Sequence, residues 1–148
     1  MAKDNTKSLF GSEVDEALDA SGRIVRVALD TGADALFDYV LPEFMGAVEP
    51  GQRVEVPFGR ANKLQQAFVV ALITEPDEIA KCRKFKLKSV KAILDETPLL
   101  NEQLMELAKW ISQYYVCPVG QVFSAMVPAA VKRDAGVKKK AIVYLAAE

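Results

Sequence analysis

The stretch from Leu36 to Arg60 constrains the fold of this chain most, because it predicts two strands joined by a turn-rich connection. In the first strand, Phe37, Tyr39 and Leu41 occupy alternate positions and therefore share one face. Asp38 lies on the opposite face, where its carboxylate is open to a partner. The alternation predicts an amphipathic strand with an acid on its polar side.

The second half of this stretch predicts a tight turn followed by another strand. Pro50 and Gly51 suit the central positions of a type II turn, because proline fixes φ and glycine accepts a positive φ. After the turn, Arg53 opposes an apolar face formed by Val54, Val56 and Phe58. Pro57 cannot donate to a ladder, so this strand lies at an edge or ends there. Gly59 follows, at a position where the backbone can approach another group closely.

Three further segments predict strands. Residues 23–29 form a β-branched run, and the almost continuous apolar run at 67–73 is typical of a strand buried on both faces. Residues 84–89 alternate strictly, and residues 90–94 continue the same strand. One face of that strand would carry Lys84, Lys86 and Lys88, and the other Phe85 and Leu87.

The strands are separated by polar segments that predict loops. We expect a hairpin loop at 60–66 and an exposed loop at 75–78. Several short strands with one polar face predict an α+β fold, in which a small, partly closed barrel of about five strands precedes a two-helix segment. The β-rich part would span residues 23–96, and the helical part residues 97–131.

The helical part begins with a clear capping signal. Asn101 is a good N-cap, and the apolar period that follows predicts a helix of about fourteen residues. Its expected core-facing stripe is Leu104, Leu107, Ala108, Ile111 and Tyr115. A second, shorter helix would end before Pro128 and has an apolar stripe of Val119, Val122, Phe123 and Met126. We favour Trp110 and Tyr114 as core-facing aromatics; the alternative is an exposed platform for stacking on bases.

The charge of the chain is balanced overall but uneven along the sequence. Its 148 residues carry a formal net charge of −1, which argues against a domain that coats nucleic acid over a long footprint. Residues 1–22 are acidic and lack a repeating apolar pattern, so we expect a disordered tail. Residues 81–91 hold six cations and no acid. A basic stripe of this length can bind a few phosphates.

Membrane insertion and export are not predicted. No apolar run approaches the ~18 residues that span a bilayer, and the first residues lack a basic-then-apolar signal pattern. Cys82 and Cys117 are far apart and lack the paired spacing of a zinc site. We therefore expect reduced thiols in a monomeric, cytoplasmic protein.

The sequence lacks the side chains on which most catalytic sites depend. The chain has no histidine, which excludes a Ser-His-Asp constellation and a histidine-ligated metal. Phosphate loops of the GxxxxGK[ST] and GxGxxG types are absent. A carboxylate-only enzyme is the remaining alternative, and no pair of acids is marked out for it. We expect neither enzymatic activity nor a cofactor in this chain.

Four motifs stand in order along the sequence. They are F-D-Y-x-L-P-E at 37–43, P-G-x-R-V-x-V-P-F-G-R at 50–60, K-L-K-S-V at 86–90 and W-x-x-x-Y-Y-x-x-P-x-G at 110–120. In this set and order, the chain resembles the N-terminal DNA-binding domain of the primosomal protein N′ (PriA) family of replication-restart helicases. The resemblance extends from Arg23 to Lys132.

The resemblance implies a pocket that binds the free 3′ end of a DNA strand without sequence preference. The family positions of this pocket correspond to Phe37, Asp38, Gly59 and Lys88. Their chemistry suits a strand end, because a carboxylate accepts the terminal 3′-hydroxyl and a lysine meets the nearest phosphate. Weaker phosphate contacts are expected from Arg60, Lys84 and Lys86.

The resemblance also implies a longer protein and its partners. The whole protein would be an ATP-dependent 3′-to-5′ DNA helicase, with its ATP, magnesium and zinc sites beyond Glu148. Residues 132–148 would form a linker and the start of a winged-helix domain. The expected partner is DNA at branched forks in the bacterial nucleoid, together with single-strand-binding protein and other primosome proteins.

Each site residue also has a plainer interpretation. Asp38 would pair with a cation across the sheet, Gly59 would serve only a turn, and Lys88 would belong to a solvated face. At the level of the domain, the alternative is a β-barrel protein-interaction module whose lysine stripe binds an acidic partner, such as the tail of a single-strand-binding protein.

Overall fold

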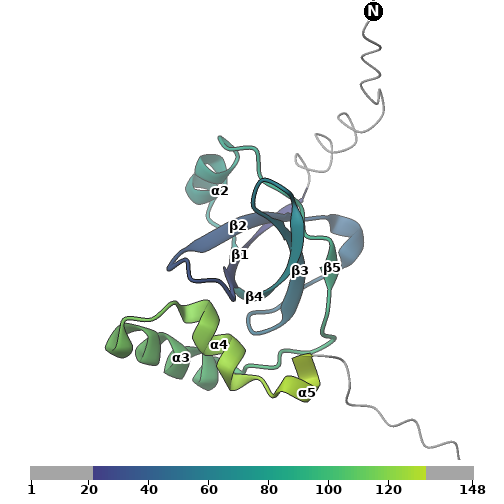
Figure 1. Ribbon diagram of the computed structural model, residues 1–148. Coiled ribbons are helices and arrows are strands. Elements are labelled where there is room, and N and C mark those ends of the chain that lie inside the picture. Colours follow the sequence, from purple (N-terminus) through teal and green to yellow (C-terminus); the bar gives the residue numbers. More distant parts are fainter. Residues whose placement is uncertain (1–21, 133–148) are drawn as a thin grey trace, which may run out of the picture.

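The computed structural model describes residues 22–132, and Figure 1 shows a curved sheet with helices packed below it and one helix at its upper edge. In chain order the strands and helices are β1 (Arg23–Leu29), β2 (Leu36–Leu41), the 3-10 helix η1 (Glu43–Met45), β3 (Arg53–Phe58), β4 (Lys63–Ile73), α2 (Pro76–Cys82), β5 (Ala92–Ile93), α3 (Glu102–Tyr115), α4 (Val119–Met126) and α5 (Ala129–Lys132). The expectations for residues 1–21 and 133–148 lie outside the described residues.

The five strands form one antiparallel sheet in the order β2-β1-β4-β3-β5. The sheet is not closed by a ladder, but a parallel bridge between Val40 and Ser89 joins the edge strand β2 to the segment just before β5, the other edge strand. There Val40 N donates to Lys88 O at 3.0 Å, and Val90 N donates to Val40 O at 2.9 Å. The predicted α+β class, with a partly closed sheet and following helices, is confirmed.

Two large apolar clusters pack on the sheet, one on each face, and a smaller third cluster includes Ile24, Ile73 and Cys82. Inside the curve lies a cluster that includes Val25, Leu41, Val54 and Val69. Between the sheet and the helices lies a second cluster, which includes Phe68, Leu100, Met105, Ala108 and Phe123. Adjacent residues of β4 thus enter opposite layers, which confirms the strand predicted to be buried on both faces.

The turn before β3 has the predicted conformation. Gly51 has a φ of +91°, and Gln52 N donates to Glu49 O at 3.2 Å across the turn. A Cβ at Gly51 would lie 2.0 Å from Leu100 O, so glycine is required for space as well as for φ. The turn thereby seats the start of the helical part against the sheet.

Helix α3 confirms the predicted cap and length but corrects the predicted face. Asn101 Oδ1 accepts a hydrogen bond from Leu104 N at 2.9 Å, and the helix has 14 residues. Its buried residues are Met105 and Ala108, whereas the expected core residues Leu104, Leu107 and Tyr115 are exposed. The core meets only a narrow stripe of α3, and the element that α3 contacts most is α4.

The aromatic residues of α3 were also expected to face the core, and this was wrong. Trp110 and Tyr114 are 56% and 66% exposed. Their rings stack on each other with centroids 5.2 Å apart and planes 18° apart. Their helical spacing therefore places them together on the solvent side of α3.

Three local predictions in the β-rich part were wrong. Strand β4 begins at Lys63, inside the expected hairpin loop at 60–66. Helix α2 replaces the expected loop at 75–78; Pro76 starts the helix, where its missing N–H costs nothing. Residues 84–89 form a turn and an irregular segment instead of a strand, and β5 has only two residues. This segment forms one bridge, to Val40, and no ladder.

Arg53 was expected on a polar face but is 2% exposed. Its Nε and Nη2 atoms donate to the two carboxylate oxygens of Asp95 at 3.0 and 2.7 Å, and its backbone N donates to Asp95 Oδ2 at 2.9 Å. This pair fastens β3 to the segment after β5. In the part of the chain that the structure describes, no helix is long and apolar enough to cross a membrane.

Candidate nucleic-acid interface

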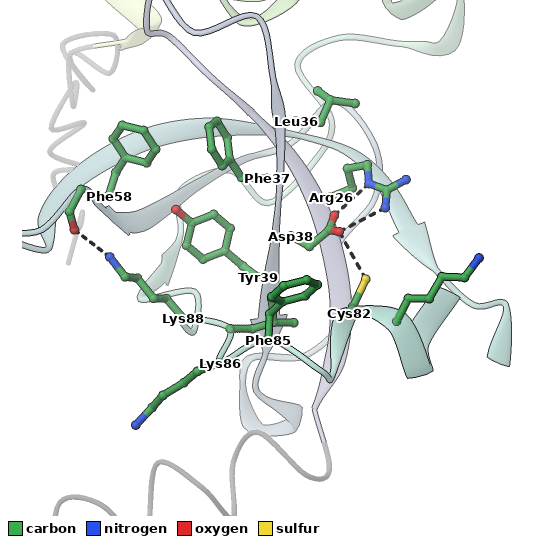
Figure 2. Close-up of a pocket in the computed structure, with 13 residues that line it drawn as sticks. Arg26, Leu36, Phe37, Asp38, Tyr39, Phe58, Cys82, Phe85, Lys86 and Lys88 are labelled. Atoms are coloured by element: carbon green, nitrogen blue, oxygen red, sulfur yellow. Dashed lines mark hydrogen bonds and ion pairs between the residues drawn. The ribbon is translucent and has the colours of Figure 1, made fainter. Parts of the chain in front are cut away.

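A pocket of about 560 Å³ opens at the edge of the sheet beside α2 (Figure 2). Its walls come from β1, β2, the end of β3, α2 and the segment after α2. The lining residues are Arg26, Leu36, Phe37, Asp38, Tyr39, Phe58, Gly59, Lys81, Cys82, Phe85, Lys86, Leu87 and Lys88. A volume of this size is typical of a small-molecule or nucleotide site.

The structure brings all four principal predicted site residues into this one pocket. They are Phe37, Asp38, Gly59 and Lys88. Of the three weaker phosphate contacts, Lys86 lines the pocket, whereas Arg60 and Lys84 do not. Residues from three separate motifs of the sequence therefore meet at one place, because the bridge at Val40 carries the segment after α2 back to β2.

Asp38 is held by a cation from the neighbouring strand. The register of β1 and β2 places Arg26 opposite Asp38. Arg26 donates from Nε to Oδ1 at 2.8 Å and from Nη2 to Oδ2 at 3.1 Å, and this hydrogen bonding raises the pKa of the guanidinium. The cross-strand ion pair considered for Asp38 is thus present, and the same carboxylate also lines the pocket.

Cys82 is the third donor to Asp38. Its Sγ lies 3.3 Å from Asp38 Oδ2. Burial raises the pKa of the Cys82 thiol, and the hydrogen bond to Asp38 raises it further, so the thiol keeps its proton and donates. A carboxylate has about four acceptor positions. Two donors from Arg26 and one from Cys82 leave room for about one more.

Gly59 and Lys88 form the opposite rim of the pocket. Gly59 has a φ of +74° at the start of the β3–β4 turn, and a Cβ there would meet nothing within 4 Å. The backbone conformation, not crowding within the chain, therefore accounts for the glycine. Lys88 Nζ donates to Gly59 O at 2.8 Å, which fixes the ammonium group at the rim, as Figure 2 shows.

Aromatic rings supply the apolar surface of the pocket. Phe37 and Phe58 meet edge to face with centroids 5.1 Å apart, and Phe85, which is 74% exposed, lines the same pocket. Phe58 is half-buried, packs against the core and also lines the pocket. Tyr39 is buried; its hydroxyl donates to Pro57 O at 3.1 Å, and burial raises its pKa.

Several lining residues were not predicted for the site from the sequence, among them Arg26, Lys81, Cys82 and Phe85. Arg26 carried a signal, since it is the one charged residue within the otherwise apolar run 24–29. Lys81 and Cys82 lay in a segment not recognised as helical, and Phe85 was assigned to the buried face of a strand that does not form.

The pocket has the charge of an anion site. Arg26 and Asp38 neutralise each other, which leaves Lys81, Lys86 and Lys88 as unbalanced cations among the lining residues. No cluster of three or more metal-binding side chains occurs within residues 22–132. Three ammonium groups, three phenylalanine rings and one acceptor carboxylate suit a ligand with a phosphate, a flat ring and a hydroxyl.

Comparison with known proteins agrees with this chemistry. The family model of the PriA 3′DNA-binding domain (3′BD) matches residues 26–128. The chain belongs to the PriA 3′ DNA-binding domain family. This family match confirms the resemblance noted in the motifs, and it makes the chain a DNA-binding module of a replication restart protein, with DNA as its partner.

Individual relatives of this PriA domain cover the same region. Replication restart protein PriA of Bacillus subtilis is 39% identical over 100 residues, which is 67% of this chain. The PriA proteins of Haemophilus influenzae and of Buchnera aphidicola from Acyrthosiphon pisum are 31% and 29% identical, over 76% and 80% of the chain. The match spans only 12–15% of the length of these three proteins.

Proposed function

We propose that the pocket binds the 3′-terminal nucleotide of a DNA strand and identifies it by its free 3′-hydroxyl. The observation that carries this proposal is the convergence of Phe37, Asp38, Gly59 and Lys88 on one pocket. A strand end differs from every internal nucleotide by one hydroxyl donor. The remaining acceptor position of Asp38, next to its bonds with Arg26 and Cys82, suits that donor.

The other lining residues suit the rest of a terminal nucleotide. Phe37, Phe58 and Phe85 present ring surface to a base, and stacking on a ring tolerates any base. Lys86 and Lys88 suit the phosphate on the 5′ side of the terminal sugar. Such a pocket reads a strand end and ignores its sequence.

In the longer protein, this module would place a motor on DNA. The ligand would be the 3′ end of the nascent leading strand at an abandoned fork. The motor would be a 3′-to-5′ helicase that uses ATP and magnesium, with structural zinc, in the part of the protein outside this chain. Single-strand-binding protein and other primosome proteins would be its partners in the nucleoid.

The proposal is tested by comparing strand ends. Oligonucleotides with a 3′-hydroxyl, a 3′-deoxy and a 3′-phosphate end are titrated into wild type, Asp38→Ala and Asp38→Asn, with affinity measured by fluorescence anisotropy. Wild type should prefer the 3′-hydroxyl by about 1.5–3 kcal/mol, the usual contribution of a hydrogen bond to a charged group. Asp38→Ala should lose this preference, and Asp38→Asn should recover part of the 3′-phosphate binding because the charge repulsion is removed.

Two controls separate this result from damage to the fold. Far-ultraviolet circular dichroism should be unchanged in both variants, since loss of the partly exposed Arg26–Asp38 pair should cost only about 1 kcal/mol. An acidic peptide added as competitor tests the rival interpretation of a lysine stripe that binds acidic proteins. If wild type binds all three ends equally and the peptide displaces the DNA, the pocket does not read a 3′ end.

A further inference from the structure

A second cavity of about 400 Å³ adjoins the 3′-end pocket. The two share the consecutive residues Lys86, Leu87 and Lys88, whose chain forms the wall between them. Beyond this wall the second cavity is lined by Asn62 and Leu64 of the β3–β4 hairpin, and by Ser89 and Lys91. A ligand that fills the first cavity can therefore continue into the second without leaving the surface.

All the charged residues that line the second cavity are basic. Lys86, Lys88 and Lys91 line it, and no acidic residue does. Among residues 22–132, the ammonium groups of Lys86 and Lys91 have no hydrogen-bond or ion-pair partner. Lys91 is fixed by its backbone, whose N donates to Glu55 O at 2.8 Å. Three positive charges around one cavity favour the binding of a polyanion.

The two cavities differ in the surface they offer to a base. Phe37, Phe58 and Phe85 line the first cavity, whereas no aromatic ring lines the second. Bases bind to proteins without sequence preference mainly by stacking on rings, and phosphates bind to cations and small polar groups. The second cavity therefore suits the sugar-phosphate backbone.

The direction of the strand follows from the proposed function, on which this inference rests. If the 3′-terminal nucleotide occupies the first cavity, the strand can continue only toward its 5′ side. We propose that the second cavity binds the phosphodiester backbone of the nucleotides immediately 5′ of the terminal one, with Lys91 on the second or third linkage from the end. The domain then holds a short single-stranded 3′ tail and not the last nucleotide alone.

A linkage scan tests this register. Hexanucleotides with a 3′-hydroxyl carry one uncharged methylphosphonate at each linkage in turn, and each is titrated into wild type, Lys91→Ala and Lys84→Ala. Lys84 is the matched control, since it is an exposed lysine of the same basic segment and lines neither cavity. Lys91→Ala should weaken binding of the unmodified strand about two- to fivefold and reduce the log–log salt slope by about 0.7.

The decisive result is the position of the coupling. Neutralising the second or third linkage should weaken binding to wild type and to Lys84→Ala. It should have little effect on binding to Lys91→Ala, because the lysine that would contact that phosphate is already missing from this variant. If Lys91→Ala behaves as Lys84→Ala does, or if its coupling is spread evenly over all linkages, the second cavity is not a backbone site. Preference for a 3′-hydroxyl over a 3′-phosphate, measured on a dinucleotide, should persist in Lys91→Ala; its absence in wild type would refute the proposed function instead.

Discussion

Of the two ion pairs described above, the Arg53–Asp95 pair should contribute more to the stability of the domain, so removing Asp95 should be the more destabilising change. Asp95 accepts three hydrogen bonds from Arg53, at 2.7, 2.9 and 3.0 Å. The two side chains are 2% and 8% exposed. Asp95→Ala removes the carboxylate that faces the buried guanidinium group of Arg53, and breaking a buried ion pair typically costs about 3–5 kcal/mol.

The Arg26–Asp38 pair provides a matched control of the same chemistry at a more exposed position. Its geometry is also bidentate, but its side chains are 31% and 21% exposed. Water screens such a pair, so Asp38→Ala should cost about 1 kcal/mol. The stability of a domain of this size is about 5–15 kcal/mol, and the loss at Asp95 is therefore a large share of the total.

Guanidinium unfolding, followed by circular dichroism, measures both variants against wild type. We expect a much lower midpoint for Asp95→Ala and a small shift for Asp38→Ala, with similar slopes. A double variant, Arg53→Met with Asp95→Leu, should recover most of the loss, because it buries no unpaired charge. Equal destabilisation by Asp95→Ala and Asp38→Ala would refute the argument that burial sets the magnitude.

Three further predictions concern backbone strain, the aromatic pair and pH. Gly59→Ala should cost about 1 kcal/mol of unfolding free energy because φ is +74°, whereas Gly32→Ala, in open space without such a φ, should cost almost nothing; equal effects would contradict this. Trp110, the single tryptophan, lines neither cavity, so its fluorescence should not change when a short oligonucleotide binds, and strong quenching would support the stacking platform. Burial raises the pKa of Tyr39 above its ordinary 10.0, so above about pH 10 the unfolded chain releases a proton that the native chain retains. The free energy of unfolding should therefore fall as pH rises above about 10. Tyr39→Phe should make that fall less steep when unfolding is measured as a function of pH.

Local signals in the sequence predicted the elements whose structure is set locally. Asn101 marked the start of α3, because a cap needs only the next turn of the same helix. Pro50 and Gly51 marked the turn for the same reason. Helix α2 also carried such signals, with Pro76 at its first turn and acids after it, but a short helix has too little apolar period to be distinguished from a loop.

The remaining features depend on residues far apart in the sequence. Arg53 is buried because Asp95 meets it from 42 positions away, and strand alternation contains no information about that partner. Residues 84–89 alternate as a strand does, yet a ladder needs a partner strand over several residues, and this segment makes a single bridge, to Val40. The family motifs pointed to Phe37, Asp38, Gly59 and Lys88, which the structure brings to one pocket. The contacts of Arg26 and Cys82 with Asp38 are seen only in the folded chain.

The bridge between Val40 and Ser89 holds two walls of the pocket together. One wall, with Phe37 and Asp38, lies just before Val40, and the facing wall, with Lys86 and Lys88, lies just before Ser89. Two backbone hydrogen bonds form this bridge, so breaking them separates the walls. The apparent affinity for a ligand then scales with the fraction of molecules in which the bridge is formed. A bound ligand that touches both walls, in turn, slows hydrogen exchange at the amides of Val40 and Val90.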